Sequence, residues 1–263
     1  MTAFIGSPRR GRTLKAVEGF EKKLKQLGEI DFEYIWLKDR DLKSCRGCGI
    51  CLERGEELCP LKDDRDDLFQ RMRQADGVIF ATPVYSLQVT ALLKNMLDRF
   101  SYLFHRPCFF HKTFMPIVVQ GVYGMGGVLK YLDEVARFWG FKTCPGLGLT
   151  ISGQNLPPGE QEKIDQATEK AAARFYRLLN DPADPVPSIK DVLIFRSVRT
   201  IHSLAAGLPR DHEYYKERGW FATDYYYPTR LGWLKRLVGA WADRQALKQA
   251  RKIKSETTGS NKY

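Results

Sequence analysis

The first 180 residues alternate short apolar runs with longer segments in which apolar residues recur at helical spacing. The short runs predict five strands, at Thr2–Ile5, Asp31–Leu37, Gly77–Thr82, Phe114–Val119 and Thr143–Ile151. The helical spacing predicts helices at Thr13–Leu27, from Asp63 onward, and at Leu87–Phe104, Leu129–Trp139 and Glu160–Leu179. Strands that alternate with helices across short connections favour an α/β fold, in which a parallel sheet is covered by helices on both faces.

The pattern changes near residue 180. Three prolines between Asp181 and Pro187 mark a boundary, and the βα alternation stops there. The remainder is basic and aromatic, and Leu231–Ile253 has the spacing of a basic amphipathic helix. We therefore expect an α/β domain over residues 1–180 and a C-terminal helical arm over residues 181–263. The arm would pack against a second subunit or cover the active site.

Composition narrows the class of protein. Apolar residues make up 43% and charged residues 28% of the chain, as in ordinary globular domains. The apolar runs are too short to span a bilayer, and no export signal is apparent, so we expect a cytoplasmic protein. The net charge of +11 suits nucleic acid, an anionic lipid or a phosphorylated cofactor equally well.

Three loops follow predicted strands and carry unusual residues. Ligands of open α/β sheets bind where strands end and helices begin, so these loops are candidates for one site. The first, Gly6–Thr13, joins a strand to a helix N-terminus, and its hydroxyl and arginine side chains suit a phosphate monoester. It matches neither the P-loop nor the G-x-G-x-x-G pattern. The alternative interpretation is a solvated turn with scattered arginines.

The other two loops suit a planar ligand. Thr82–Ser86 places Tyr85 where its ring could flank such a ligand, although a tyrosine packed on a strand-ending turn has the same sequence. Gln120–Gly127 is rich in glycine, which lets the backbone approach a flat ring closely. Simple entry into the next helix is the alternative interpretation of these glycines.

Taken together, four segments resemble the NADPH-dependent FMN reductase branch of the flavodoxin-like superfamily. They are Gly6–Arg9, the A-D-G-V-I-F-A-T-P-V-Y-S run at Ala75–Ser86, L-K-N-M-L-D-R at Leu93–Arg99 and the glycine turn after the fourth strand. The resemblance covers Thr2–Leu179. It implies a flavodoxin-like fold, with a five-stranded parallel sheet in the order 2-1-3-4-5.

The resemblance also implies a set of FMN contacts. The phosphate would be held by the first loop, one edge and face of the isoalloxazine by the second, and the other side by the third. The residues so assigned are Ser7, Arg9, Arg10, Thr13, Pro83, Val84, Tyr85, Ser86, Gln120, Gly121, Tyr123 and Gly124. The first loop is one residue shorter than the commonest family form, which leaves the roles of Arg10 and Arg12 open.

Four of the six cysteines form a compact motif, Cys45-x2-Cys48-x2-Cys51-x7-Cys59-Pro60. Such spacing lets several thiolates converge on one centre, and soft thiolates select an iron–sulfur cluster or zinc. Structural zinc usually pairs two C-x2-C knuckles across a long spacer, so this run favours [4Fe–4S]. The motif is similar to that of iron–sulfur flavoproteins, which implies a cluster next to FMN that transfers electrons singly. Free thiols or a loop without metal are the alternative.

We therefore expect an FMN-dependent oxidoreductase that moves electrons between NAD(P)H, or a reduced protein donor, and an acceptor through FMN and a [4Fe–4S] cluster. No side chain needs to act as an acid or base, because the cofactor supplies the chemistry. A homodimer or homotetramer is expected, and neither nucleic acid nor membrane is expected as a partner. The alternatives are a cluster-free NAD(P)H:flavin or quinone reductase, and a flavodoxin-like binding module whose basic arm docks on membrane or nucleic acid.

Overall fold

The computed structural model describes residues 1–152, 157, 159–204 and 208–260, and the chain divides into two compact units. The first comprises Met1–Gly47 and Leu61–Pro182, and the second comprises Cys48–Pro60 and Ala183–Tyr263. The cysteine-rich segment is thus divided between them. Within the described ranges, each helix is either too short or too polar to cross a membrane.

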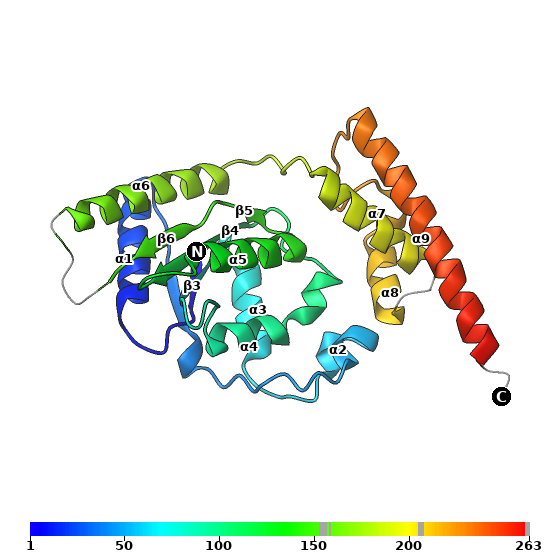
Figure 1. Cartoon of the computed structure of the whole chain (residues 1–263), viewed down its shortest axis with the longest axis horizontal. Coiled ribbons are helices and arrows are strands. Elements are labelled where there is room, and N and C mark those ends of the chain that lie inside the picture. The colour runs from blue at the N-terminus through cyan, green and yellow to red at the C-terminus, as the bar shows by residue number, and fades with distance from the viewer. Residues whose placement is uncertain (153–156, 158, 205–207, 261–263) are drawn as a thin grey trace. The chain divides into compact units, whose positions relative to one another are not determined.

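The first unit is built on a parallel sheet (Figure 1). Its strands are β1 (Thr2–Ile5), β2 (Glu33–Trp36), β3 (Gly77–Pro83), β4 (Thr113–Gln120), β5 (Lys142–Thr143) and β6 (Leu147–Thr150). The order is β2-β1-β3-β4, with β5 and β6 both pairing with β4. The predicted order 2-1-3-4-5 and the flavodoxin-like fold are confirmed.

The predicted fifth strand is divided into β5 and β6. The Cys144 amide still donates to the Phe114 carbonyl at 2.8 Å, but Pro145 has no N–H to continue the ladder. Pairing resumes at Leu147.

Alternate strand residues face opposite layers of helices. On one face Ile5, Ala81 and Ile117 pack with α1 (Arg12–Lys25) and α6 (Glu160–Leu179), which lie side by side (Figure 1). On the other face the Phe80 ring meets Phe114 at 4.9 Å and Trp139 of α5 (Met125–Trp139) at 6.0 Å between centroids. The helices α3 (Arg65–Gln74) and α4 (Ala91–Arg99) complete the unit.

Five helices begin elsewhere than the sequence predicts. The α3 helix starts at Arg65, two residues after Asp63, and the C-terminal helix starts at Trp233, two residues after Leu231. The α4 helix starts at Ala91 rather than Leu87, because residues 85–88 form a tight turn and the Thr90 hydroxyl caps the helix by accepting from the Leu93 amide at 3.3 Å. The α5 helix starts four residues early, at Met125. The α1 helix starts at Arg12, one residue before the predicted Thr13.

The second unit is helical. Its elements are α2 (Ile50–Glu53), α7 (Ile189–Ser203), α8 (Pro209–Glu217) and α9 (Trp233–Ser260). The α7 helix packs along α9, and α2 packs against α8. Buried rings of Phe195, Tyr215 and Trp220 form much of its core. Aromatic residues that follow the α/β domain in sequence thus have a packing role.

Candidate functional site

A cavity of about 550 Å³ opens at the carboxyl end of the sheet in the first unit. It lies between the loop after β1 and the ends of β3 and β4. Nine of the twelve predicted residues line it, namely Ser7, Arg9, Arg10, Thr13, Pro83, Val84, Tyr85, Gln120 and Gly121. Gly11, Arg12, Val119 and Ile151 also line it. Its volume is within the ~300–1,000 Å³ typical of small-molecule sites.

One end of the cavity is built for an anion. Arg9, Arg10 and Arg12 contribute three positive charges, and no carboxylate stands among the described lining residues. The cavity also meets the N-terminus of α1, where, in the described part of the chain, no side chain caps the first turn and no acidic residue lies in it. Free backbone N–H groups, the helix dipole and guanidinium groups all attract negative charge.

Each of the three arginines has a different environment. The Arg9 Nη2 atom lies 3.5 Å from the Tyr85 hydroxyl, and the Arg10 guanidinium lies over the Trp36 ring, 5.4 Å from its centroid. Arg12 Nη1 donates to the Ile151 carbonyl at 2.8 Å, and this bond links the loop after β1 to the segment after β6. The three arginines that line the cavity therefore contact three different partners.

Ser7 shapes the loop itself. Its hydroxyl donates to the Arg9 carbonyl at 2.9 Å, and its oxygen lies 3.3 Å from the Arg9 amide. This local turn holds the loop in a compact form between β1 and α1. The Ser7 hydroxyl can rotate to donate to a bound anion.

Tyr85, an aromatic residue that lines the cavity, lies in a strained turn. Tyr85 and Gln88 exchange two backbone hydrogen bonds of 2.9 Å around Ser86 and Leu87, whose φ angles are 48° and 64°. Positive φ at both central residues is usually left to glycine or asparagine, and such strain concentrates at ligand sites. Tyr85 is 40% exposed at the cavity.

Ser86, Tyr123 and Gly124 are described but do not line the cavity. Ser86 is at the tip of the turn, and Tyr123 is 77% exposed. Gly124 has φ of 107° and packs against this turn, since an added Cβ would lie 3.1 Å from Val84 and Leu87 side-chain carbons. The third loop thus supports the second through Gly124.

Thr90 connects the loops and was not among the predicted residues. Its buried hydroxyl donates to the Gly6 carbonyl at 2.6 Å, and its amide donates to the Thr82 hydroxyl at 3.3 Å. The Gly6 amide in turn donates to the Ala81 carbonyl at 2.8 Å. Thr90 therefore fixes the loop after β1 relative to the end of β3. Its position before an amphipathic helix is the sequence signal for a cap, but not for the bond to Gly6.

A buried ion pair links the two ends of the cysteine-containing segment, residues 43–63. Asp63 and Arg99 side chains are at most 1% exposed, and Arg99 Nη2 donates to Asp63 Oδ1 at 3.0 Å. Arg99 Nη1 also donates to the Lys43 carbonyl at 2.7 Å, and the Lys43 amide donates to Asp63 at 2.9 Å. Asn95 adds a bond of 2.8 Å to the Leu42 carbonyl. Both ends of the segment are thus fastened to α4.

The ion pair also sets the ionisation of Asp63. Burial alone would raise the pKa of its carboxyl, but hydrogen bonds from Arg99 and from the Lys43 and Arg65 amides outweigh burial and lower this pKa. The carboxylate is therefore charged at neutral pH. Arg99 therefore serves a structural ion pair with Asp63.

The four cysteines lie between these fastened ends. Cys45 and Cys48 are exposed, and Cys51 and Cys59 are partly buried. Gly47, Gly49 and Gly55 have positive φ, which allows the tight turns of this segment. In the described second unit, the sulfur atoms of Cys48, Cys51 and Cys59 are not all within 4.8 Å of one another. The donor set has the chemistry of a thiolate centre, and metal would have to draw the thiols together.

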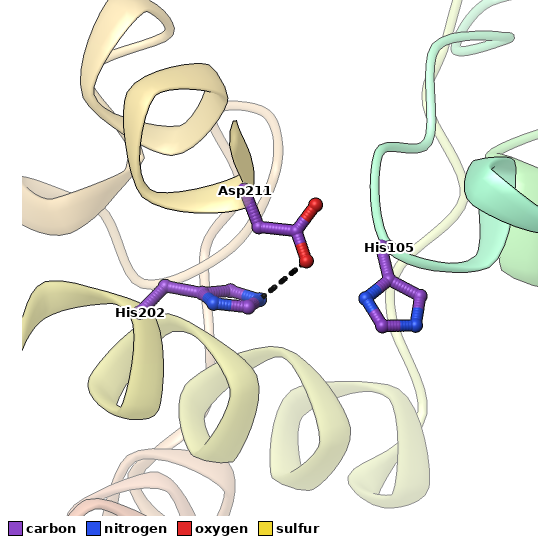
Figure 2. Close-up of side chains that lie close together, drawn as sticks. All are labelled: His105, His202 and Asp211. Carbon is purple, nitrogen blue, oxygen red and sulfur yellow. Dashed lines mark ion pairs between the residues drawn. The ribbon is translucent and has the colours of Figure 1, made fainter. Parts of the chain in front are cut away.

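The second unit has a buried polar pair of its own. His202 Nε2 of α7 lies 3.8 Å from Asp211 Oδ2 of α8 (Figure 2), and both side chains are buried. The Tyr215 ring covers His202 at 4.9 Å between centroids. Figure 2 also draws His105, which belongs to the first unit. We interpret the His202–Asp211 pair as a contact that joins α7 to α8.

Comparison with known proteins agrees with this architecture. Residues 1–155 match the family model described as NADPH-dependent FMN reductase. An iron–sulfur flavoprotein from Archaeoglobus fulgidus is 32% identical over 225 residues, covering 82% of this chain and 96% of that protein. A second iron–sulfur flavoprotein from the same organism is 38% identical over 189 residues, covering 66% of this chain and 94% of that protein.

Solved structures share the fold. An azoreductase from Bacillus anthracis superposes with a TM-score of 0.50 at 18% identity, covering 67% of this chain and 98% of that chain. At this level the similarity extends to the fold alone. The family match, by contrast, covers more than half of the sequence. The chain therefore belongs to the NADPH-dependent FMN reductase family and is an oxidoreductase with a flavodoxin-like fold.

Proposed function

We propose that this protein binds FMN in the 550 Å³ cavity and transfers electrons from NAD(P)H, or from a reduced protein donor, to an acceptor through FMN and a [4Fe–4S] cluster. The proposal rests on the uneven distribution of charged and aromatic residues around the cavity. Three arginines and a helix N-terminus form one end, and a tyrosine turn and the ends of β3 and β4 form the other. This division suits a ligand with a phosphate at one end and a flat ring system at the other.

The residues fit such a ligand in specific ways. Arg9, Thr13 and the first-turn amides of α1 would hold the phosphate, with Ser7 donating from its hydroxyl. Pro83, Val84 and Tyr85 would bind the ring, and Gln120 would be available at its edge. The Gln120 side chain accepts from the Met125 amide at 2.8 Å and donates to the Thr150 hydroxyl at 2.8 Å, so its orientation is fixed.

When bound, FMN supplies two-electron exchange with NAD(P)H and one-electron exchange with a metal centre. The chain's contribution would be to position the ring and to limit water at it. The Tyr85–Gln88 turn, supported by Gly124, forms a wall on one side. The hydrogen bond from Thr90 to the Gly6 carbonyl would hold this turn in place relative to the loop after β1.

For the cluster we propose Cys45, Cys48, Cys51 and Cys59 as ligands. Their number, softness and spacing support iron–sulfur over zinc. The names of the Archaeoglobus relatives point the same way. The Asp63–Arg99 ion pair would fix the segment's ends while the thiolates close on the cluster.

The flavin proposal is tested by titrating the cofactor-free full chain with FMN and recording flavin fluorescence and the visible spectrum. We expect saturable binding at one site per chain, and reduction of the bound flavin by NADH or NADPH. Binding of riboflavin as tight as that of FMN would contradict the assignment of the arginine end to phosphate.

The cluster proposal is tested separately by iron and acid-labile sulfide analysis after anaerobic purification. Cys48→Ser should lower both contents and leave FMN binding intact, whereas Cys108→Ser, outside the motif, should retain both. Wild-type protein that reduces FMN without iron, even after anaerobic reconstitution, would favour the cluster-free reductase.

A further inference from the structure

The outward face of α9 carries large apolar side chains that are exposed. Trp233, Leu234, Leu237 and Trp241 are 75%, 48%, 60% and 55% exposed. Their spacing places them on one stripe along the first turns of the helix. Exposed apolar side chains that gather in this way indicate a binding surface, whereas scattered ones need no explanation.

This stripe is not the face that holds the second unit together. The inward face of α9 packs against α7 and buries Ala242 and Ala246. Gly239 also faces α7, where an added Cβ would lie 3.3 Å from an Arg196 side-chain carbon. The core of the unit is therefore complete without the outward stripe.

Within residues 233–250 of α9, the charged residues are also divided between its two faces, with basic residues exposed and the acidic residue turned toward α7. Between Trp233 and Ala250, a stretch that is described throughout, the exposed charged residues are Arg236, Arg244 and Lys248. The single acidic residue, Asp243, is turned inward, where it accepts from Arg196 Nε and Arg199 Nη2 at 3.0 Å each. Hydrogen bonds from Arg196 and Thr200 help to outweigh burial and lower the pKa of Asp243. The outward face thus combines apolar bulk with positive charge that no acidic residue of this stretch offsets.

Against the expectation from the sequence that membrane is not a partner, we propose that this face docks the protein on an anionic lipid bilayer, with α9 lying in the plane of the interface. Tryptophan and leucine enter the boundary between headgroups and acyl chains, while arginine and lysine meet lipid phosphates. A second copy of this face would bring no exposed acidic residue from Trp233–Ala250 to meet Arg244 and Lys248. Nucleic acid would leave Leu234 and Leu237 without a matching surface, because bases stack on aromatic rings. The docking does not depend on the flavin or the cluster.

The test is flotation of the full chain with phosphatidylcholine vesicles, prepared with or without phosphatidylglycerol. We expect flotation with the anionic vesicles and a steep decrease as salt is added, because salt screens the attraction. The double substitution Arg244→Gln/Lys248→Gln should weaken binding about 30-fold. Leu237→Gln and Trp241→Gln should weaken it at every salt concentration. Lys216→Gln, which removes an exposed charge on α8, is the matched control.

Circular dichroism would verify that each variant keeps the wild-type helix content. Absence of flotation with anionic vesicles at low salt would overturn the proposal, as would unchanged flotation of Leu237→Gln and Trp241→Gln. Sedimentation gives a further check. A wild-type dimer that Leu237→Gln dissociates would assign the face to a second copy and overturn lipid docking.

Discussion

Arg9 joins the cationic end of the cavity to its aromatic wall, since its guanidinium lies 3.5 Å from the Tyr85 hydroxyl. If Arg9 binds the FMN phosphate, Arg9→Gln removes a charge-assisted hydrogen bond of ~1.5–3 kcal/mol. We expect the Kd for FMN to rise about 10- to 100-fold and the Kd for riboflavin to change little. Fluorescence titration measures both. Lys130→Gln, which removes an exposed charge on α5, is the control, and equal losses for both flavins would refute the phosphate role.

Gly124 is the second residue with a defined structural requirement. Its φ of 107° is strained for any other residue, and an added Cβ would lie 3.1 Å from side-chain carbons of Val84 and Leu87, closer than ordinary contact. Gly124→Ala should lower the free energy of unfolding by about 1–3 kcal/mol. Gly126→Ala is the matched control, because no described atom lies within 4 Å of its added Cβ, and it should be neutral or slightly stabilising. Urea unfolding of both variants checks this, and similar losses would argue against strain at Gly124.

At the scale of elements, α4 connects the cavity to the cysteine segment. Its N-terminal cap, Thr90, donates to the Gly6 carbonyl in the loop after β1. Asn95 and Arg99 donate to the carbonyls of Leu42 and Lys43, where the cysteine-containing segment begins. The first four strands and α6 could be predicted from periodicity, whereas the division of the fifth strand could not. The start of α4 could not, because Leu87 fits the helical spacing but lies in a turn that tertiary contacts with Gly124 support.

The Asp63–Arg99 ion pair gives a prediction at this scale. Asp63→Asn leaves the buried Arg99 without its charged partner and should cost about 3–5 kcal/mol at pH 7. The folded pKa of Asp63 is lowered, so its stabilisation is present above the ordinary value of 3.8 and is lost as pH falls through the folded pKa. The difference in unfolding free energy between wild type and variant should therefore shrink below about pH 4. Urea unfolding at several pH values measures it, and a constant difference would contradict the linkage.

At the scale of the whole molecule, the chain has two compact units, and the cavity belongs to the first alone. A ligand stabilises the folded unit that binds it, by about 2.7 kcal/mol when the free ligand concentration is 100 times its Kd. FMN should therefore slow amide hydrogen exchange in β1, β3 and β4 and leave α7 and α9 nearly unchanged. Exchange followed by mass spectrometry, with riboflavin as the comparison ligand, provides the measurement. Equal protection in α7 and α9 would show that the units are coupled on binding.

The sequence by itself determined the alternation of strands and helices, and with it the edge where three ligand loops meet, because the carboxyl ends of parallel strands share one edge. It also determined the chemistry available there, since hydroxyls, arginines and thiols are local properties of a segment. The tertiary structure decided which residues become partners. Asp63 meets Arg99 and Gly6 meets Thr90 across separations of 36 and 84 residues, and Ser86 does not line the cavity that Tyr85 borders. Such pairings depend on the distances between packed elements, and no local periodicity encodes those distances.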